Sequence, residues 1–250
     1  EDLVKYADLF GLPSFTTYTI DTKEKLIEEI QAVPEYEGVI VSGQDALLRC
    51  DRNSILIVVE TMVPFFVAFE GRKPQARELV ILSVLSALAI GRRAVFFAMP
   101  GFKPVAAMVI LTGVAFGAEA GFMVGAMTMF CSNVLFGQGP WTPWQMFAMG
   151  VMGLLAGVLF RKGILHRGRF SLSVFGGLVT FLIYGGIMNP ASVLMYQPNP
   201  DWQMILTAYI TGVPADAIHA LATAMFLWFL SEPMLEKLDR VKVKYGLVER

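Results

Sequence analysis

Four glycines at a spacing of four residues restrict most strongly how this chain can fold. Gly113, Gly117, Gly121 and Gly125 lie in an apolar stretch, so one face of a helix containing them carries no side chains. In water this spacing weakens a helix, whereas in a lipid bilayer it lets a second helix backbone approach closely. The pattern therefore predicts helices that pack through glycine inside a membrane.

Composition supports a membrane location for most of the chain. Hydrophobic residues make up 55% of the sequence and charged residues only 16%. Residues 1–53 carry 11 acidic and 5 basic side chains (net −6), and residues 54–250 carry 10 and 15 (net +5). Few charges interrupt the apolar part, which is typical of membrane helices rather than of a surface in water. We expect an acidic extramembrane segment followed by a basic membrane domain.

Seven apolar runs follow the acidic segment, and each is predicted to form a helix. They cover about residues 54–69, 79–99, 104–118, 120–138, 145–160, 171–189 and 204–231. The first run contains Glu60 and Pro64, which are costly at mid-membrane unless they pack against protein.

The predicted fold is an all-α polytopic membrane protein. Residues 1–53 are interpreted as a small α/β extramembrane fragment, and 54–76 as an extra transmembrane helix with a basic linker. Residues 77–250 are predicted to form a six-helix substrate-binding membrane domain with a basic tail.

Basic residues predict the orientation of this domain in the cell membrane. They cluster before the second run, after the fifth and after the last. The positive-inside rule places these three segments, and with them the C-terminus, in the cytoplasm. The links near Lys103, residues 138–144 and residues 196–202 are then expected outside.

The predicted outer links are rich in aromatic and amide side chains. Glycine and proline between residues 137 and 143 predict a short, stiff loop that holds two tryptophans above the helix ends. Tryptophan and tyrosine also form the ordinary belt at a membrane interface, and that belt accounts for part of the set. Stacking on a flat ligand accounts for the rest. The candidate binding residues are Phe102, Gln138, Trp141, Trp144, Gln145 and Tyr196.

Polar residues inside the apolar runs form a second group of candidates, because each needs a partner or a cavity. Asn133, Asn189, Asp216 and His219 lie within runs, and Arg93 lies toward the outer end of the second run. Asp216 and His219 share one helix face. A proton relay or a metal pair is one interpretation. A hydrogen bond between helices is favoured, because the chain has only two histidines and no cysteine near them. No bound metal or cofactor is predicted.

Other function classes have little support in the sequence. We find no motif of a hydrolase, metalloprotease or phosphate-binding loop, so we predict no catalytic residue, no enzyme activity and no nucleic-acid partner. Asn189-Pro190-Ala191 resembles the aquaporin signature, but such channels need two copies and this chain has one. A channel or facilitator, and a membrane-embedded enzyme, stay as alternatives.

Two segments resemble the substrate-binding S components of energy-coupling factor (ECF) vitamin transporters. Residues 113–125 are similar to the glycine-stepped second and third helices of that family, and residues 212–220 to its last helix. The resemblance covers about residues 77–246. It implies a six-helix protein that captures a vitamin from outside and associates with a transmembrane coupling subunit and two cytoplasmic ATPases.

The resemblance also implies a docking surface and a ligand class. In the family, small residues on the first core helix contact the coupling subunit, and here Ser83, Ala87 and Gly91 have the required spacing. Packing inside the protein is the alternative role of that stripe. The segment from Gly137 to Gln145 resembles a cobalamin-type subgroup. A cobalamin-like corrinoid is therefore the first expected ligand, with flavins, folates and queuosine precursors as alternatives.

Overall fold

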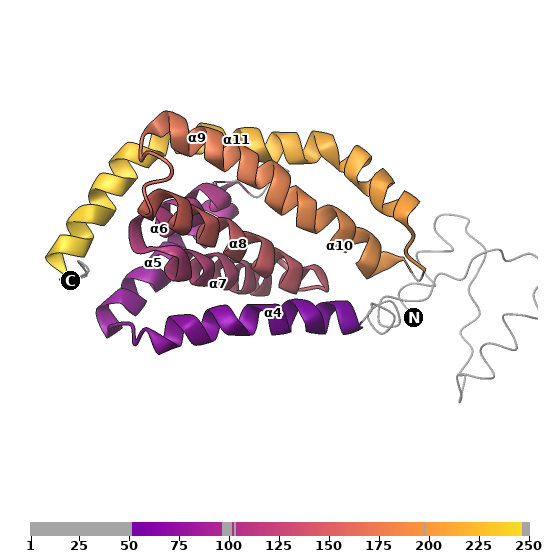
Figure 1. Ribbon diagram of the computed structural model, residues 1–250, viewed down its shortest axis with the longest axis horizontal. Helices are drawn as coiled ribbons and strands as arrows, with labels where there is room; N and C mark the ends of the chain where they lie inside the picture. The colour runs from indigo at the N-terminus through magenta and orange to yellow at the C-terminus, as the bar shows by residue number, and fades with distance from the viewer. Residues whose placement is uncertain (1–51, 97–101, 103, 198, 247–250) are drawn as a thin grey trace, which may run out of the picture. The chain divides into compact units, whose positions relative to one another are not determined.

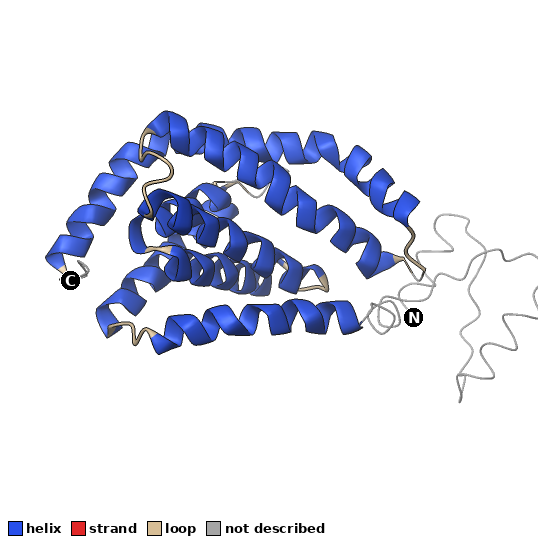
Figure 2. Cartoon of the chain, in the orientation of Figure 1, coloured by secondary structure: helices blue, strands red, loops and turns tan. Residues whose placement is uncertain are grey.

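The computed structural model describes residues 52–96, 102, 104–197 and 199–246. Within these ranges the chain consists of helices and short links, without a strand (Figure 2). The elements are α4 (Arg52–Gly71), α5 (Ala76–Val95), α6 (Val105–Phe116), α7 (Ala118–Phe136), α8 (Trp141–Arg161), α9 (Arg169–Val179), the π-helix η1 (Thr180–Gly185), α10 (Gly186–Tyr196) and α11 (Trp202–Lys244). The α/β segment predicted over residues 1–53 lies, except for its last two residues, outside the described part.

The all-α membrane fold is confirmed. Among the described residues, four helical segments are long and apolar enough to cross a bilayer: α7, α8, the continuous stretch Arg169–Tyr196 and α11. The short run at 104–118 forms α6, which has 12 residues, all of them buried. Because α6 is surrounded by protein, its apolar character reflects a core position rather than contact with lipid.

Glycine packing in the centre of the bundle differs from the prediction. Gly117 adopts φ +102 and separates α6 from α7, so the four glycines lie on two helices instead of on one helix face. This backbone conformation favours glycine. Gly113 and Gly121 both lie against the carbonyl of Gly153 in α8, and Gly125 lies against the next turn of α8 toward its N-terminus. Glycines on α6, α7 and α8 therefore allow the backbones of these three helices to approach one another closely.

The remaining helices flank this centre on two sides. Figure 1 shows α4 along one side of α6–α8, and α11 along the other. On the first side α4 packs against α7 and α8, and the Phe65 ring stacks on Phe122 with centroids 4.2 Å apart. On the second side α11 contacts α9, η1, α10 and α6. The polar Glu60 and the helix-interior Pro64 lie on the exposed side of α4.

Helix α11 is longer than the predicted run at 204–231. It begins after Asp201, whose carboxylate accepts a hydrogen bond from the Met204 amide at 2.7 Å. Its 43 residues extend over about 65 Å at 1.5 Å per residue, roughly twice the hydrocarbon thickness of a bilayer. The predicted basic tail is thus largely a continuation of this helix.

Basic side chains gather where α6 ends. Arg161 donates to the Phe116 carbonyl at 3.4 Å, Arg167 to the Val114 carbonyl at 2.8 Å, and Lys242 to the Ala115 carbonyl at 2.7 Å. The last carbonyls of a helix lack intrahelical donors and carry partial negative charge, so cations stabilise this end. Two of the three basic segments predicted to be cytoplasmic thus meet at one end of the bundle, as the predicted topology requires.

Candidate functional site

Asn133 is the centre of a buried hydrogen-bond group between α5, α7 and α8. Its Oδ1 accepts from Arg93 Nη1 at 2.8 Å, and its Nδ2 donates to Thr142 Oγ1 at 3.0 Å and to Gln145 Oε1 at 2.9 Å. The same Arg93 nitrogen donates to Ser132 Oγ at 2.7 Å. Asn133 is fully buried, and these bonds satisfy both ends of its amide. The predicted candidates Arg93, Asn133 and Gln145 therefore come together.

Gln138 has a different role from the other predicted amides. Its side chain is exposed, accepts a hydrogen bond from Thr142 Oγ1 at 2.7 Å and donates to the Phe130 carbonyl at 3.4 Å. It thus fastens the link between α7 and α8 and contacts the Asn133 group only through Thr142.

A second polar group joins α10 and α11. Asn189 Nδ2 donates to Asp216 Oδ2 at 2.7 Å, which confirms the favoured hydrogen bond between helices. Gly185 lies against the Asp216 carboxylate and Gly212 against the Asn189 amide, and a Cβ at either glycine would overlap these groups. Asn189 itself lies inside α10, which continues past Pro190 to Tyr196, so the sixth run does not end at Asn189 as predicted.

Tyr184 lies close to both groups, near enough to Arg93, Gln145 and Asp216 to interact electrostatically with each. Its ring meets the His219 ring edge-on, with centroids 4.9 Å apart. Tyr184 belongs to η1, and single π-helical turns inside α-helices occur frequently at functional sites. Residues from α5, α7, α8, η1, α10 and α11 therefore line one polar region.

The predicted loop that presents two tryptophans is wrong. Trp141 is the first residue of α8 and Trp144 lies in the same first turn. Both rings pack against Ala191 and Met195 of α10. Proline is tolerated in the first helical turn, where the backbone amides have no intrahelical partner, so Pro143 does not prevent a helix here.

Two further aromatic candidates lie apart from the polar region. Phe102 packs with Phe96 and Phe226, at centroid distances of 6.4 and 5.4 Å. Tyr196 is exposed at the end of α10. The structure therefore does not bring these two together with Asn133 or Asp216.

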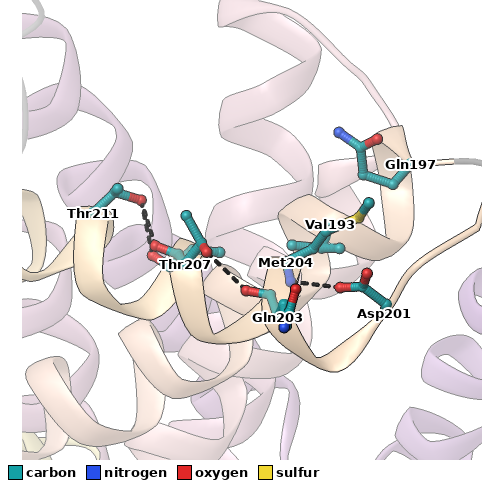
Figure 3. A pocket seen from close by; sticks show the side chains of 8 residues that line it. Val193, Gln197, Asp201, Gln203, Met204, Thr207 and Thr211 are labelled. Carbon is teal, nitrogen blue, oxygen red and sulfur yellow. Dashed lines mark hydrogen bonds between the residues drawn. The ribbon is translucent and has the colours of Figure 1, made fainter.

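A cavity of about 480 Å³ lies between the adjoining ends of α10 and α11. Figure 3 shows Gln203 and Thr207 of α11, with its N-cap Asp201, on one side of this cavity, and Val193 of α10 with its C-cap Gln197 on the other. The Thr207 hydroxyl donates to the Gln203 carbonyl, and the Asp201 carboxylate caps α11, so these groups serve the helix itself. No residue of the polar region lines this cavity. We therefore assign the candidate site to the polar region, where charged and amide groups converge.

Sequence reasoning missed three residues of the site: Ser132, Thr142 and Tyr184. Thr142 lies in the first turn of α8, where the sequence predicts a loop, and nothing in the sequence distinguishes Tyr184, a residue of η1, from other tyrosines in membrane segments. Ser132 precedes Asn133 directly, so its position beside a polar candidate was an available signal. Within the described ranges, no group of three or more His, Cys, Asp or Glu side chains could hold a metal ion.

The small-residue stripe lies outside the polar region. Ser83, Ala87 and Gly91 are all exposed on α5, and a Cβ on Gly91 would meet nothing within 4 Å. Large apolar residues beside them, including Val84 and Leu88, are exposed as well. Packing of this stripe inside the described part of the protein is therefore excluded.

Comparison with known proteins gives one family. A family model described as "ECF-type riboflavin transporter, S component" matches residues 73–234, more than half of the chain. The match leaves α4 and the acidic segment outside.

Individual curated relatives share little sequence identity with this chain. A UPF0397 protein of Vibrio atlanticus (strain LGP32) is 27% identical over 124 residues, which cover 47% of this chain and 68% of the relative. A UPF0397 protein of Aliivibrio fischeri (strain MJ11) is 27% identical over 121 residues, covering 46% of this chain and 66% of the relative. No solved structure gives a significant match.

Proposed function

Because this chain belongs to the family of ECF-type riboflavin transporter S components, we propose that it is the substrate-specific subunit of an ECF-type importer that captures a vitamin from outside. The family is a component of a membrane transporter, so the chain is a multi-pass transporter component and not an enzyme.

The observation that carries this proposal is the convergence of polar side chains from six helical elements. A bilayer offers no partners to such groups, and polar residues inside membrane helices usually mark a substrate pathway or site. We propose that Arg93, Asn133, Gln145, Tyr184, Asn189 and Asp216 bind the vitamin, with His219 beside Tyr184 and with Trp141 and Trp144 at the edge of the site.

Flavin-like vitamins are the first candidates for the substrate, because the matching family is described by riboflavin. The corrinoid expectation depended on a tryptophan loop between residues 137 and 145. That segment enters α8 at Trp141, and its rings pack on α10, so the expectation loses its structural basis.

The exposed stripe on α5 supports a coupling partner. Ser83, Ala87 and Gly91 would let a helix of a transmembrane coupling subunit approach closely, since small residues drive helix association in membranes. Two cytoplasmic ATPases would complete the importer. In this proposal the C-terminus is cytoplasmic, on the side where Arg161, Arg167 and Lys242 gather.

Cysteine labelling tests this orientation. In a variant without Cys50 and Cys131, we expect an impermeant maleimide applied to intact cells to label Asn199→Cys. The same reagent should label His166→Cys and Glu236→Cys only after the membrane is opened; all three introduced positions are exposed. The reverse labelling pattern would contradict the proposed topology.

A thermal-shift screen of the purified full-length chain against vitamins tests the function. A tight ligand stabilises the folded state by RT ln(1 + [L]/Kd), about 4 kcal/mol at a thousandfold excess over Kd, which raises the Tm by several degrees. We expect such a shift with at least one vitamin and no turnover of it. Conduction through liposomes without saturable binding would favour the channel alternative instead.

A further inference from the structure

Arg93 directs its charged group into the protein. Its Nη1 donates to Ser132 Oγ and Asn133 Oδ1 at 2.7 and 2.8 Å, and both acceptor residues are fully buried. The guanidinium carbon lies 5.4 Å from the centroid of the Phe136 ring. An arginine that only anchors a helix in the membrane extends its head toward water and lipid headgroups. Arg93 is instead held in place by interior groups.

One edge of this guanidinium has no partner among the described residues. Both hydrogen bonds use Nη1, so Nε and Nη2 donate to none of those residues. Neither atom is among the buried unpaired polar atoms of the described chain, so this edge is accessible. Nε and Nη2 form the planar fork that pairs with two oxygens of a carboxylate or phosphate.

The positive charge of Arg93 is also unmatched by a direct counter-ion. The described residues contain no ion pair to Arg93. Asp216, the acidic residue of the polar region, forms no ion pair with Arg93, and its carboxylate accepts from Asn189. The groups that contact Arg93 directly are therefore neutral. A half-buried cation in a membrane protein is costly under these conditions, and an anion beside it would offset the cost.

Building on the proposed function, we propose that the substrate carries an anionic group, a carboxylate or a phosphate, which binds Nε and Nη2 of Arg93 in a bidentate manner. Among flavin-like vitamins, this selects a phosphorylated flavin over uncharged riboflavin. Arg93 is then the residue that determines specificity for the acidic form of the vitamin. A neutral analogue leaves the fork unpaired, and a site built for a hydrogen-bonding group discriminates strongly against a ligand that lacks it.

Matched pairs of probes test this inference on the purified full-length chain. The pairs are flavin mononucleotide and riboflavin for phosphate, and nicotinate and nicotinamide or biotin and its amide for carboxylate. We expect the acidic member of one pair to bind wild-type protein at least tenfold more tightly than its neutral partner. Arg93→Gln should weaken binding of that acidic probe about 10- to 100-fold and leave the neutral partner nearly unchanged.

Arg92→Gln is the matched control, because it removes the same charge from the adjacent position. Arg92 donates only to the thioether of Met108 among the described residues, on the side of α6, so this variant should keep the preference for the acidic probe. If Arg93→Gln does not fold, Arg93→Lys replaces it: the charge remains, the fork is lost, and an intermediate affinity is expected.

Four results would overturn the inference. Equal or tighter binding of the neutral probe, or an unchanged preference in Arg93→Gln, would contradict it while the importer function stands. Equal loss of preference in Arg92→Gln would show a general effect of charge instead of a fork at Arg93. Failure of every vitamin to stabilise the wild-type chain would contradict both this inference and the proposed function.

Discussion

Gly153→Ala is expected to lower the stability of the folded protein by about 1–3 kcal/mol or more, a large change for a single methyl group. A Cβ at this position would overlap the backbone carbonyl of Gly121, and the Gly153 carbonyl already lies against Gly113. These are backbone atoms of packed helices, so they cannot move aside as a flexible side chain would. Thermal unfolding of the purified protein measures the effect as a drop in Tm.

Gly91→Ala provides the matched control for this prediction. Gly91 also lies inside a helix, but a Cβ there meets nothing within 4 Å. Alanine has the higher helix propensity, so this variant should be as stable as wild type or more stable, by up to about 1 kcal/mol. If Gly153→Ala behaved in the same way, the close approach of α6, α7 and α8 would not be what holds the bundle together.

Ala87→Trp is expected to abolish most vitamin transport and to change vitamin affinity of the isolated chain by no more than a few fold. Ala87 lies at the centre of the exposed stripe on α5, away from the polar region. A tryptophan ring there would keep a partner helix from close approach, because the small-residue contact depends on the missing side-chain volume. Uptake in cells and ligand titration of the purified chain measure the two effects separately.

Ala68→Trp, on the exposed side of α4, controls for adding a large ring to a membrane-facing surface. It should leave uptake near the wild-type level. Parallel loss of uptake and affinity in Ala87→Trp would mean that α5 contributes to the binding site instead of to a partner surface. Normal uptake by Ala87→Trp would show that the coupling subunit does not bind at this stripe.

Much of the fold could be predicted from hydrophobic runs. Each of the seven predicted runs contains a helix, because an apolar segment of sufficient length in a membrane must satisfy its backbone hydrogen bonds within itself. The break at Gly117 lies at the boundary between the predicted runs 104–118 and 120–138, whereas the single helix face inferred from the glycine spacing was wrong, since spacing alone does not reveal a change of chain direction. Nor did the sequence indicate that α11 continues to Lys244 through charged residues.

The candidate site was predicted in part. Asn133, Asn189 and Asp216 stood out because polar groups inside apolar runs need partners, and each has them. The tryptophans were misplaced because glycine and proline between residues 137 and 143 were interpreted as a loop. Pro140 is instead the N-cap residue of α8, where proline fits without loss of a helical hydrogen bond. Tyr184 was missed because a π-turn cannot be recognised from periodicity alone.

The π-turn η1 keeps two distant parts of one helix in phase with α11. Gly177 lies near Ala220 and Ala224, and Gly185 lies against Asp216. The two glycines are eight residues apart, which in a regular α-helix is two turns and about 80° of further rotation. Because η1 accommodates one extra residue, this rotation is cancelled and the two glycines both face α11. Deleting one residue between Thr180 and Gly185 would leave the two glycines seven residues apart, only about 20° short of two full turns of a regular α-helix. Asn189 would then still face Asp216, so a single-residue gap in a homologue would mark the loss of the π-turn and not of the Asn189–Asp216 pair.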